Sequence, residues 1–106
     1  MHKEGDIVIC FPSGDIDIAH SPQLRKVFDE IIKQNEKKVV VDLSAVTLMD
    51  TAGLATLIEM LHRLQKSNGH FKLSNLDAKI KAMFDVLKVS AFFDIYDTRV
   101  NAMGAF

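Results

Sequence analysis

The segment Asp50-Thr51-Ala52-Gly53 places an acid, a hydroxyl and a glycine between two apolar stretches. Residues 39–43 are apolar except for Asp42, a composition that is typical of a buried strand. The leucines between Leu54 and Leu64 recur at helical spacing. A hydroxyl at the start of that helix is exposed and faces a dipole that favours negative charge. Thr51 is therefore suited to be either a helix cap or a phosphate acceptor.

Two more acids, Asp15 and Asp17, alternate with isoleucines along a predicted strand over residues 15–18. Alternation places both carboxylates on one face, ~7 Å apart along the strand. Charges of this kind protect an edge strand from unwanted pairing. They also form a small acidic binding surface if the Asp50-Thr51 turn emerges beside them. The pattern leaves both interpretations open.

Residues that could carry out metal or nucleophilic chemistry lack the necessary spacing. Cys10 lies inside an apolar strand, where a free cysteine behaves as a small hydrophobe. No serine has the Gly-x-Ser-x-Gly context of a hydrolase, and no glycine-rich loop with lysine is present to hold a nucleotide. No two imidazoles are spaced as metal ligands among His2, His20, His62 and His70. We expect no enzyme activity, no metal and no cofactor.

Length and charge point to one ordinary globular domain covering residues 1–106. The 13 basic and 14 acidic side chains give a net charge of −1, so no basic surplus indicates nucleic-acid binding. No apolar run approaches the length of a bilayer span, and no signal peptide begins the sequence, so we expect no membrane insertion. One cysteine excludes an internal disulfide and suits a reducing compartment. We therefore expect a cytoplasmic protein.

The order of predicted elements indicates an α/β fold. Turn residues and periodicity predict a helix over 22–34 with Ser21 as its N-cap, and a second helix from about 52 to 66 with Gly69 as its left-handed stop. Asn75 or Asp77 caps a third helix, and a short helix over 98–103 ends the chain. Strands are predicted over 7–11, 15–18, 38–43, 71–73 and 92–96. Strands separated by helices imply parallel crossovers. We predict a mixed sheet of four to five strands covered by about four helices.

Four motifs, spaced along the chain in the order Gly14–Asp17, Val41–Ser44, Met49–Leu54 and Gly69, resemble those of a STAS domain, and most closely those of the stand-alone bacterial anti-sigma factor antagonists. The resemblance covers residues 6–98 and rests on two specific motifs and two supporting ones: Val41-Asp42-Leu43-Ser44, Met49-Asp50-Thr51-Ala52-Gly53-Leu54, Gly14-Asp15-Ile16-Asp17, and Gly69 before a short strand.

The resemblance implies a binding module that is switched by phosphorylation. Its acceptor corresponds to Thr51, and its partner is a kinase of the histidine-kinase-like ATPase fold that doubles as an anti-sigma factor. A cognate phosphatase reverses the modification. The implied partner-binding surface consists of Asp15, Asp17, Asp50, Thr51, Ala52 and Gly53. In that surface a side chain at Gly53 is expected to obstruct docking more than folding.

This sequence departs from the family pattern in two places. Threonine stands where serine is the commoner acceptor, and Ala52 stands where a second hydroxyl is frequent. The first strand of the family is short or missing here, since only three residues precede the turn at residues 4–6. An alternative function keeps the fold: an accessory subunit that docks on the ATPase of a lipid ABC transporter and needs no phosphate.

Overall fold

The computed structural model describes residues 1–106 and shows the predicted α/β fold, with a mixed sheet of five strands and four α-helices. No helix combines the length and the apolar character needed to cross a membrane. The elements in chain order are β1 (His2–Glu4), β2 (Ile7–Cys10), β3 (Gly14–Ile16), α1 (Ser21–Lys33), β4 (Lys38–Asp42), β5 (Val46–Met49), α2 (Thr51–Lys66), β6 (His70–Ser74), α3 (Ala78–Val86), a 3₁₀ turn (Ser90–Phe92), β7 (Asp94–Tyr96) and α4 (Arg99–Gly104).

The main sheet has the strand order β1-β2-β4-β6-β7. The first strand is short, as expected, and pairs antiparallel with β2 through a turn in which Gly5 has a φ of 60°. All other neighbours in this sheet are parallel, because a helix connects each strand to the next. The valines of β4 are completely buried, as the continuous apolar run predicts for a central strand.

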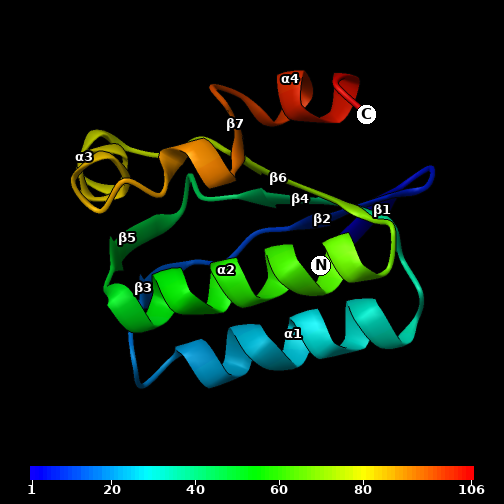
Figure 1. Ribbon diagram of the computed structural model, residues 1–106, viewed down its shortest axis with the longest axis horizontal. Helices are drawn as coiled ribbons and strands as arrows, with labels where there is room; N and C mark the ends of the chain where they lie inside the picture. Colours follow the sequence, from blue (N-terminus) through cyan, green and yellow to red (C-terminus); the bar gives the residue numbers. More distant parts are fainter.

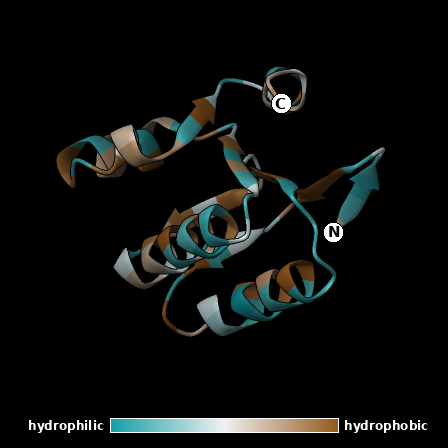
Figure 2. Cartoon of the chain, turned by 45° about the vertical axis from the view of Figure 1, so that its right-hand side comes forward, coloured by the Kyte–Doolittle hydropathy of each residue, from teal (hydrophilic) through white to brown (hydrophobic).

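Helices cover both faces of this sheet (Figure 1). On one face α1 and α2 lie side by side and enclose the main core, which includes Val39 and Val41 of β4. Val40 points the other way, and together with Ile9 it is buried on the face covered by α4. Figure 2 shows the hydrophobic and hydrophilic sides of α1, which explain why this helix buries only one side.

A second, two-stranded sheet was not anticipated from the sequence. β5 pairs in parallel with β3 at the end of the molecule where α2 begins (Figure 1). In β5 the two central residues, Thr47 and Leu48, are exposed, while Val46 and Met49 are buried. This burial pattern does not alternate, so periodicity could not identify the strand.

The start of α1 differs from the prediction because of Asp17. β3 ends at Ile16, and the Asp17 carboxylate accepts a hydrogen bond from the His20 N–H at 3.0 Å. The Asp17 carbonyl accepts from the Ser21 N–H. The N-cap is consequently His20, and Ser21 is already the first helical residue.

The end of α2 also differs in one detail. Gly69 was predicted to take the left-handed conformation, but Asn68 does so, with a φ of 62°. Gly69 is instead required for packing, since a Cβ atom there would lie 2.8 Å from Leu64 Cδ2 and 3.0 Å from the Lys37 carbonyl oxygen. Asp77, one of the two predicted caps, accepts a hydrogen bond from the Ile80 N–H at the start of α3.

The predicted last strand over 92–96 is shorter than expected. Phe92 belongs to the 3₁₀ turn and is exposed, whereas Phe93 is buried against Phe84, with 5.5 Å between the ring centroids. The final helix occupies Arg99–Gly104 and is capped by Thr98, whose hydroxyl accepts from the Asn101 N–H.

The burial of Cys10 leads to a chemical prediction. Desolvation raises the pKa of the Cys10 thiol from 9.0 to about 11, so the folded state holds the thiol proton more tightly than the unfolded state does. At pH 8 Cys10 of the native protein should not react with iodoacetamide, while Cys10 of the urea-unfolded protein should be alkylated. The contribution of this thiol to stability should be complete below pH 9 and decline towards pH 11. Rapid alkylation of the native protein, read by mass spectrometry, would contradict the buried placement.

Candidate functional site

Thr51 is the first residue of α2, and its side chain is exposed. The preceding residue, Asp50, is the N-cap, with extended backbone angles and a carboxylate that accepts a hydrogen bond from the Gly53 N–H at 3.0 Å. Capping is therefore performed by Asp50, not by Thr51. Of the two roles that the sequence left open for Thr51, the cap is excluded, and its hydroxyl stands at an anion-tolerant helix start.

Asp50 also joins α2 to the turn after β3. Its second carboxylate oxygen accepts a hydrogen bond from the Ile18 N–H at 3.1 Å, and its backbone N–H donates to the Ile16 carbonyl at 3.2 Å. One acid thus satisfies two backbone donors from segments that are distant in sequence. Asp50 positions Thr51 relative to the β3 turn.

Gly53 forms the tightest contact of this junction. A Cβ atom on this residue would lie 2.2 Å from the Ile16 carbonyl oxygen, far inside any tolerated distance. The expectation that a side chain at Gly53 would disturb docking more than folding is therefore wrong, because the obstacle is backbone of the same chain. Ala52, beside it, is half-buried, and its carbonyl accepts a hydrogen bond from the Thr56 hydroxyl.

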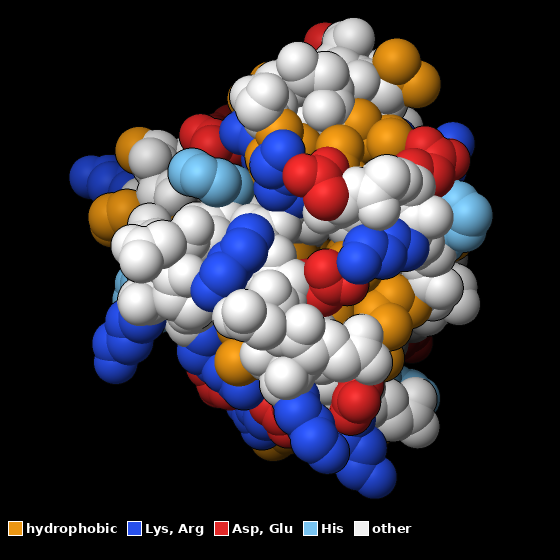
Figure 3. Space-filling view, turned by 90° about the vertical axis from the view of Figure 1, so that its right-hand side faces the viewer, with side chains coloured by type: hydrophobic (Ala, Val, Ile, Leu, Met, Phe, Trp, Pro, Cys, Tyr) orange, Lys and Arg blue, Asp and Glu red, His pale blue; other side chains and the backbone are white.

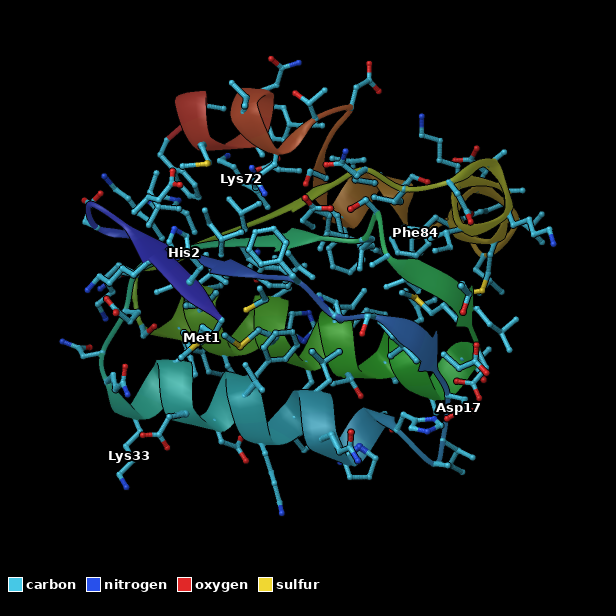
Figure 4. All side chains as sticks on the ribbon, turned by 180° about the vertical axis from the view of Figure 1, so that it is seen from behind. Met1, His2, Asp17, Lys33, Lys72 and Phe84 are labelled. Atoms are coloured by element: carbon cyan, nitrogen blue, oxygen red, sulfur yellow. The ribbon has the colours of Figure 1, made fainter.

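The two acids of the Gly14–Asp17 motif do not share a strand face. Asp15 lies in β3, is exposed, and accepts a hydrogen bond from the Thr47 hydroxyl of β5 at 2.9 Å. Asp17 lies in the following turn, where its Oδ1 is 2.7 Å from His20 Nδ1. This hydrogen bond lowers the pKa of Asp17, against a smaller opposing effect of desolvation. Figure 4 shows Asp17 at the end of the molecule where β3, α1 and α2 meet.

The segments around Thr51 contain aspartates and neither lysine nor arginine, whereas α3 brings lysines to the same end of the molecule (Figure 1). Residues 11–24 and 42–58 include four aspartates and neither a lysine nor an arginine. Lys33, at the other end of α1, marks the opposite end of the molecule in Figure 4. Figure 3 views that opposite end directly and shows many lysine and arginine side chains on it.

Sequence reasoning missed the apolar part of the site. Ile18 and Leu48 are 76% and 54% exposed, and they belong to the turn and the strand that flank the start of α2. The alternating pattern predicted a strand that includes Ile18, but β3 ends at Ile16.

The protein has no group of three or more His, Cys, Asp or Glu side chains placed to hold a metal ion. Two of the four histidines contact acids near them in sequence. His20 Nδ1 lies against the Asp17 carboxylate, and His2 Nε2 lies 3.4 Å from Glu4 Oε1 on the exposed hairpin.

Comparison with known proteins is consistent with this geometry. A family model described as "STAS domain" matches residues 1–102. A candidate anti-sigma factor antagonist of Thermotoga maritima is 28% identical over 92% of this chain and 88% of its own length. A crystal structure of a candidate anti-sigma factor antagonist from Thermotoga maritima, 28% identical in sequence, superimposes with a TM-score of 0.88 over 93% of this chain and 86% of that one. The anti-sigma-B factor antagonist of Bacillus subtilis is 28% identical over 88% of this chain and 84% of its own.

A prediction follows from the Gly53 contact. Gly53→Ala should destabilise the fold at the upper end of the about 1–3 kcal/mol typical of overpacking. The melting temperature should fall by about 4–8 °C for each kcal/mol, as read by circular dichroism. Gly104→Ala is the matched control, because a Cβ atom there meets nothing within 4 Å. Equal melting temperatures for both variants would show that the Ile16 carbonyl yields easily.

Proposed function

Because the chain belongs to the STAS domain family, we propose that it is an anti-sigma factor antagonist whose binding is switched by phosphorylation of Thr51. Its partner is an anti-sigma factor that is also a serine/threonine kinase of the histidine-kinase-like ATPase fold, and a phosphatase restores the binding form. The observation that carries this proposal is the exposed hydroxyl of Thr51 beside an N-cap that is already satisfied. The named function of the Bacillus subtilis relative supports the antagonist role.

A phosphate on Thr51 is compatible with the fold. The group adds close to two negative charges at a helix N-terminus, where unpaired N–H groups and the helix dipole favour anions. The neighbouring carboxylate of Asp50 is held by two backbone donors, so its charge is partly offset before the phosphate arrives. Phosphorylation is expected to change the surface and leave the architecture intact.

The local charge is sufficient to control binding. For a partner carboxylate ~6 Å from the phosphate, two added charges cost ~1.4 kcal/mol at an effective dielectric constant of ~80 and ~5.5 kcal/mol at ~20. These energies correspond to about tenfold and about ten-thousandfold losses of affinity. No conformational change is needed for a switch of this size.

The first prediction concerns the acceptor. The anti-sigma factor kinases of the source organism, each purified and incubated with ATP and this protein, should include one that adds a single phosphate to Thr51. Tandem mass spectrometry locates the group, and Thr51→Ala should accept none. Thr47→Ala is the matched control, since this exposed threonine is near the site but donates its hydroxyl to Asp15. Phosphate on Thr47, on Thr56 or on a serine would refute the assignment.

The second prediction separates charge from shape. Thr51→Glu places a carboxylate at the first position of α2, where the helix dipole favours negative charge. The free energy of unfolding should stay unchanged or rise by about 0.3–1 kcal/mol, and the melting temperature should not fall. The same variant should bind the kinase more weakly than Thr51→Ala, and salt should reduce the difference. Isothermal titration calorimetry at two salt concentrations measures the difference in affinity between the two variants and its dependence on salt.

The outcome that contradicts the switch is equally defined. If Thr51→Ala and Thr51→Glu bind an ATPase partner with the same high affinity, the charge at this position does not control docking. That result would favour a constitutive accessory subunit.

A further inference from the structure

The two strands of the small sheet each continue a strand of the main sheet. β3 follows β2, and β5 follows β4, with only three residues between the strands in each case. Cys10 and Val41 are register partners, so Phe11 and Asp42 stand beside each other where the chain leaves the main sheet. We call these two residues the exit points. The small sheet leads from them towards Thr51, so a contact at the exit points bears on the whole proposed partner surface.

Asp42 is a buried acid whose carboxylate shapes the turn into β5. It is only 5% exposed, and it shares the face of β4 with Val40, on the side of the main sheet that α4 covers (Figure 1). Its Oδ1 accepts a hydrogen bond from the Ser44 N–H at 2.9 Å. The Leu43 carbonyl then accepts one from the N–H of Val46, the first residue of β5, at 3.1 Å. The direction in which β5 leaves the main sheet therefore depends on how the Asp42 carboxylate is held.

Arg99, the first residue of α4, contacts both exit points. Its Nη1 lies 3.9 Å from Asp42 Oδ2, and its guanidinium carbon lies 5.1 Å from the centroid of the Phe11 ring. This is the only ion pair that Asp42 makes. Ser74 is its register partner in β6, but the buried hydroxyl of Ser74 makes no hydrogen bond. The second oxygen of Asp42 is thus held from α4, by the same side chain that stacks on Phe11.

The small sheet has few other attachments that could fix its position. β3 and β5 pair with each other and with no strand of the main sheet, and their register shifts between Gly14 and Asp15. At one end the two short connections join the small sheet to the main sheet, and at the other end the Asp50 junction joins it to α2. A contact that holds both exit points therefore reduces the freedom of the small sheet before any partner binds.

We propose that Arg99 is a positioning residue for the partner-binding surface: it clamps the two exit points and so preorganises β3, β5 and the start of α2 for docking. The proposal rests on the function proposed above. Arg99 lies on α4, on the opposite face of the main sheet from α2 (Figure 1), and acts through Asp42 and Phe11. A preorganised surface loses less conformational freedom on binding, so loss of the clamp weakens recognition and leaves the chemistry at Thr51 unchanged.

Hydrogen exchange of the protein alone tests the clamp. Arg99→Gln removes the charge and the stacked guanidinium, and should speed exchange of the Val46 N–H by about fivefold, the size expected for one cation–π contact with a weak ion pair. The N–H of the buried Leu73 in β6 should stay protected. Lys81→Gln is the matched control, because this exposed cation pairs with Asp97, 3.7 Å away, just before α4. NMR spectroscopy follows the individual amides, and circular dichroism verifies that both variants fold.

Phosphorylation kinetics connect the clamp to docking. With the purified kinase that modifies Thr51, Arg99→Gln should raise KM by about fivefold and leave kcat unchanged, because the missing contact acts before the chemical step. Arg99→Lys keeps the charge without the planar stacking group and should recover part of the loss. Asp42→Asn keeps an oxygen for the Ser44 N–H but removes the charge that Arg99 faces, so it should also raise KM. The double variant should have the KM of Arg99→Gln alone, since both changes break one contact.

The outcomes separate the two proposals. Unchanged exchange of the Val46 N–H in Arg99→Gln would overturn the clamp, whatever the kinase does. If that exchange quickens but KM equals that of Lys81→Gln, Arg99 does not position the docking surface, and this proposal falls while the switch remains. If no kinase of the organism modifies the protein, the switch fails, and faster exchange still supports the clamp. Faster exchange together with a raised KM, partly recovered in Arg99→Lys, supports the positioning role.

Discussion

The carbonyl of Ile16 is the point at which the two halves of the candidate site meet. It accepts the N–H of Asp50 and lies so close to Gly53 that only a glycine fits. The Asp50 carboxylate then binds the N–H of Ile18 and that of Gly53, so the β3 turn and the first turn of α2 are held from both sides. The exposed Thr51 takes its position from this junction, while the two acids of the β3 motif are held beside it by Thr47 and His20.

The junction also determines how the surface can be switched. A hydroxyl fixed on a packed helix start can gain or lose charge without disturbing the core, because its neighbours are held by backbone hydrogen bonds. Residues 11–24 and 42–58, the segments that flank this junction, contain neither lysine nor arginine, so they offer no strong cation to neutralise an added phosphate. Its charge is presented outward to whatever docks there.

The sequence was a good guide wherever burial followed a single period. The valine run of β4 and the leucine spacing of α2 predicted their elements to within two residues, because each packs one continuous stripe or strand against the core. Prediction failed where local hydrogen bonds or distant backbone decided the outcome. The Asp17 carboxylate ended β3 early by binding the His20 N–H, which exposed Ile18. The need for glycine at position 53 depends on Ile16, which no local pattern reveals.

A rigid junction has a consequence for the strength of the switch. The backbone hydrogen bond from Asp50 to Ile16 and the close approach of Gly53 to the same carbonyl fix the first turn of α2. A phosphate on Thr51 therefore cannot be moved away from a docked partner by a shift of the helix start, and its electrostatic cost lowers the affinity of the complex directly. The weakening is graded by the salt concentration, because salt screens the interaction between charges and leaves apolar contacts unscreened.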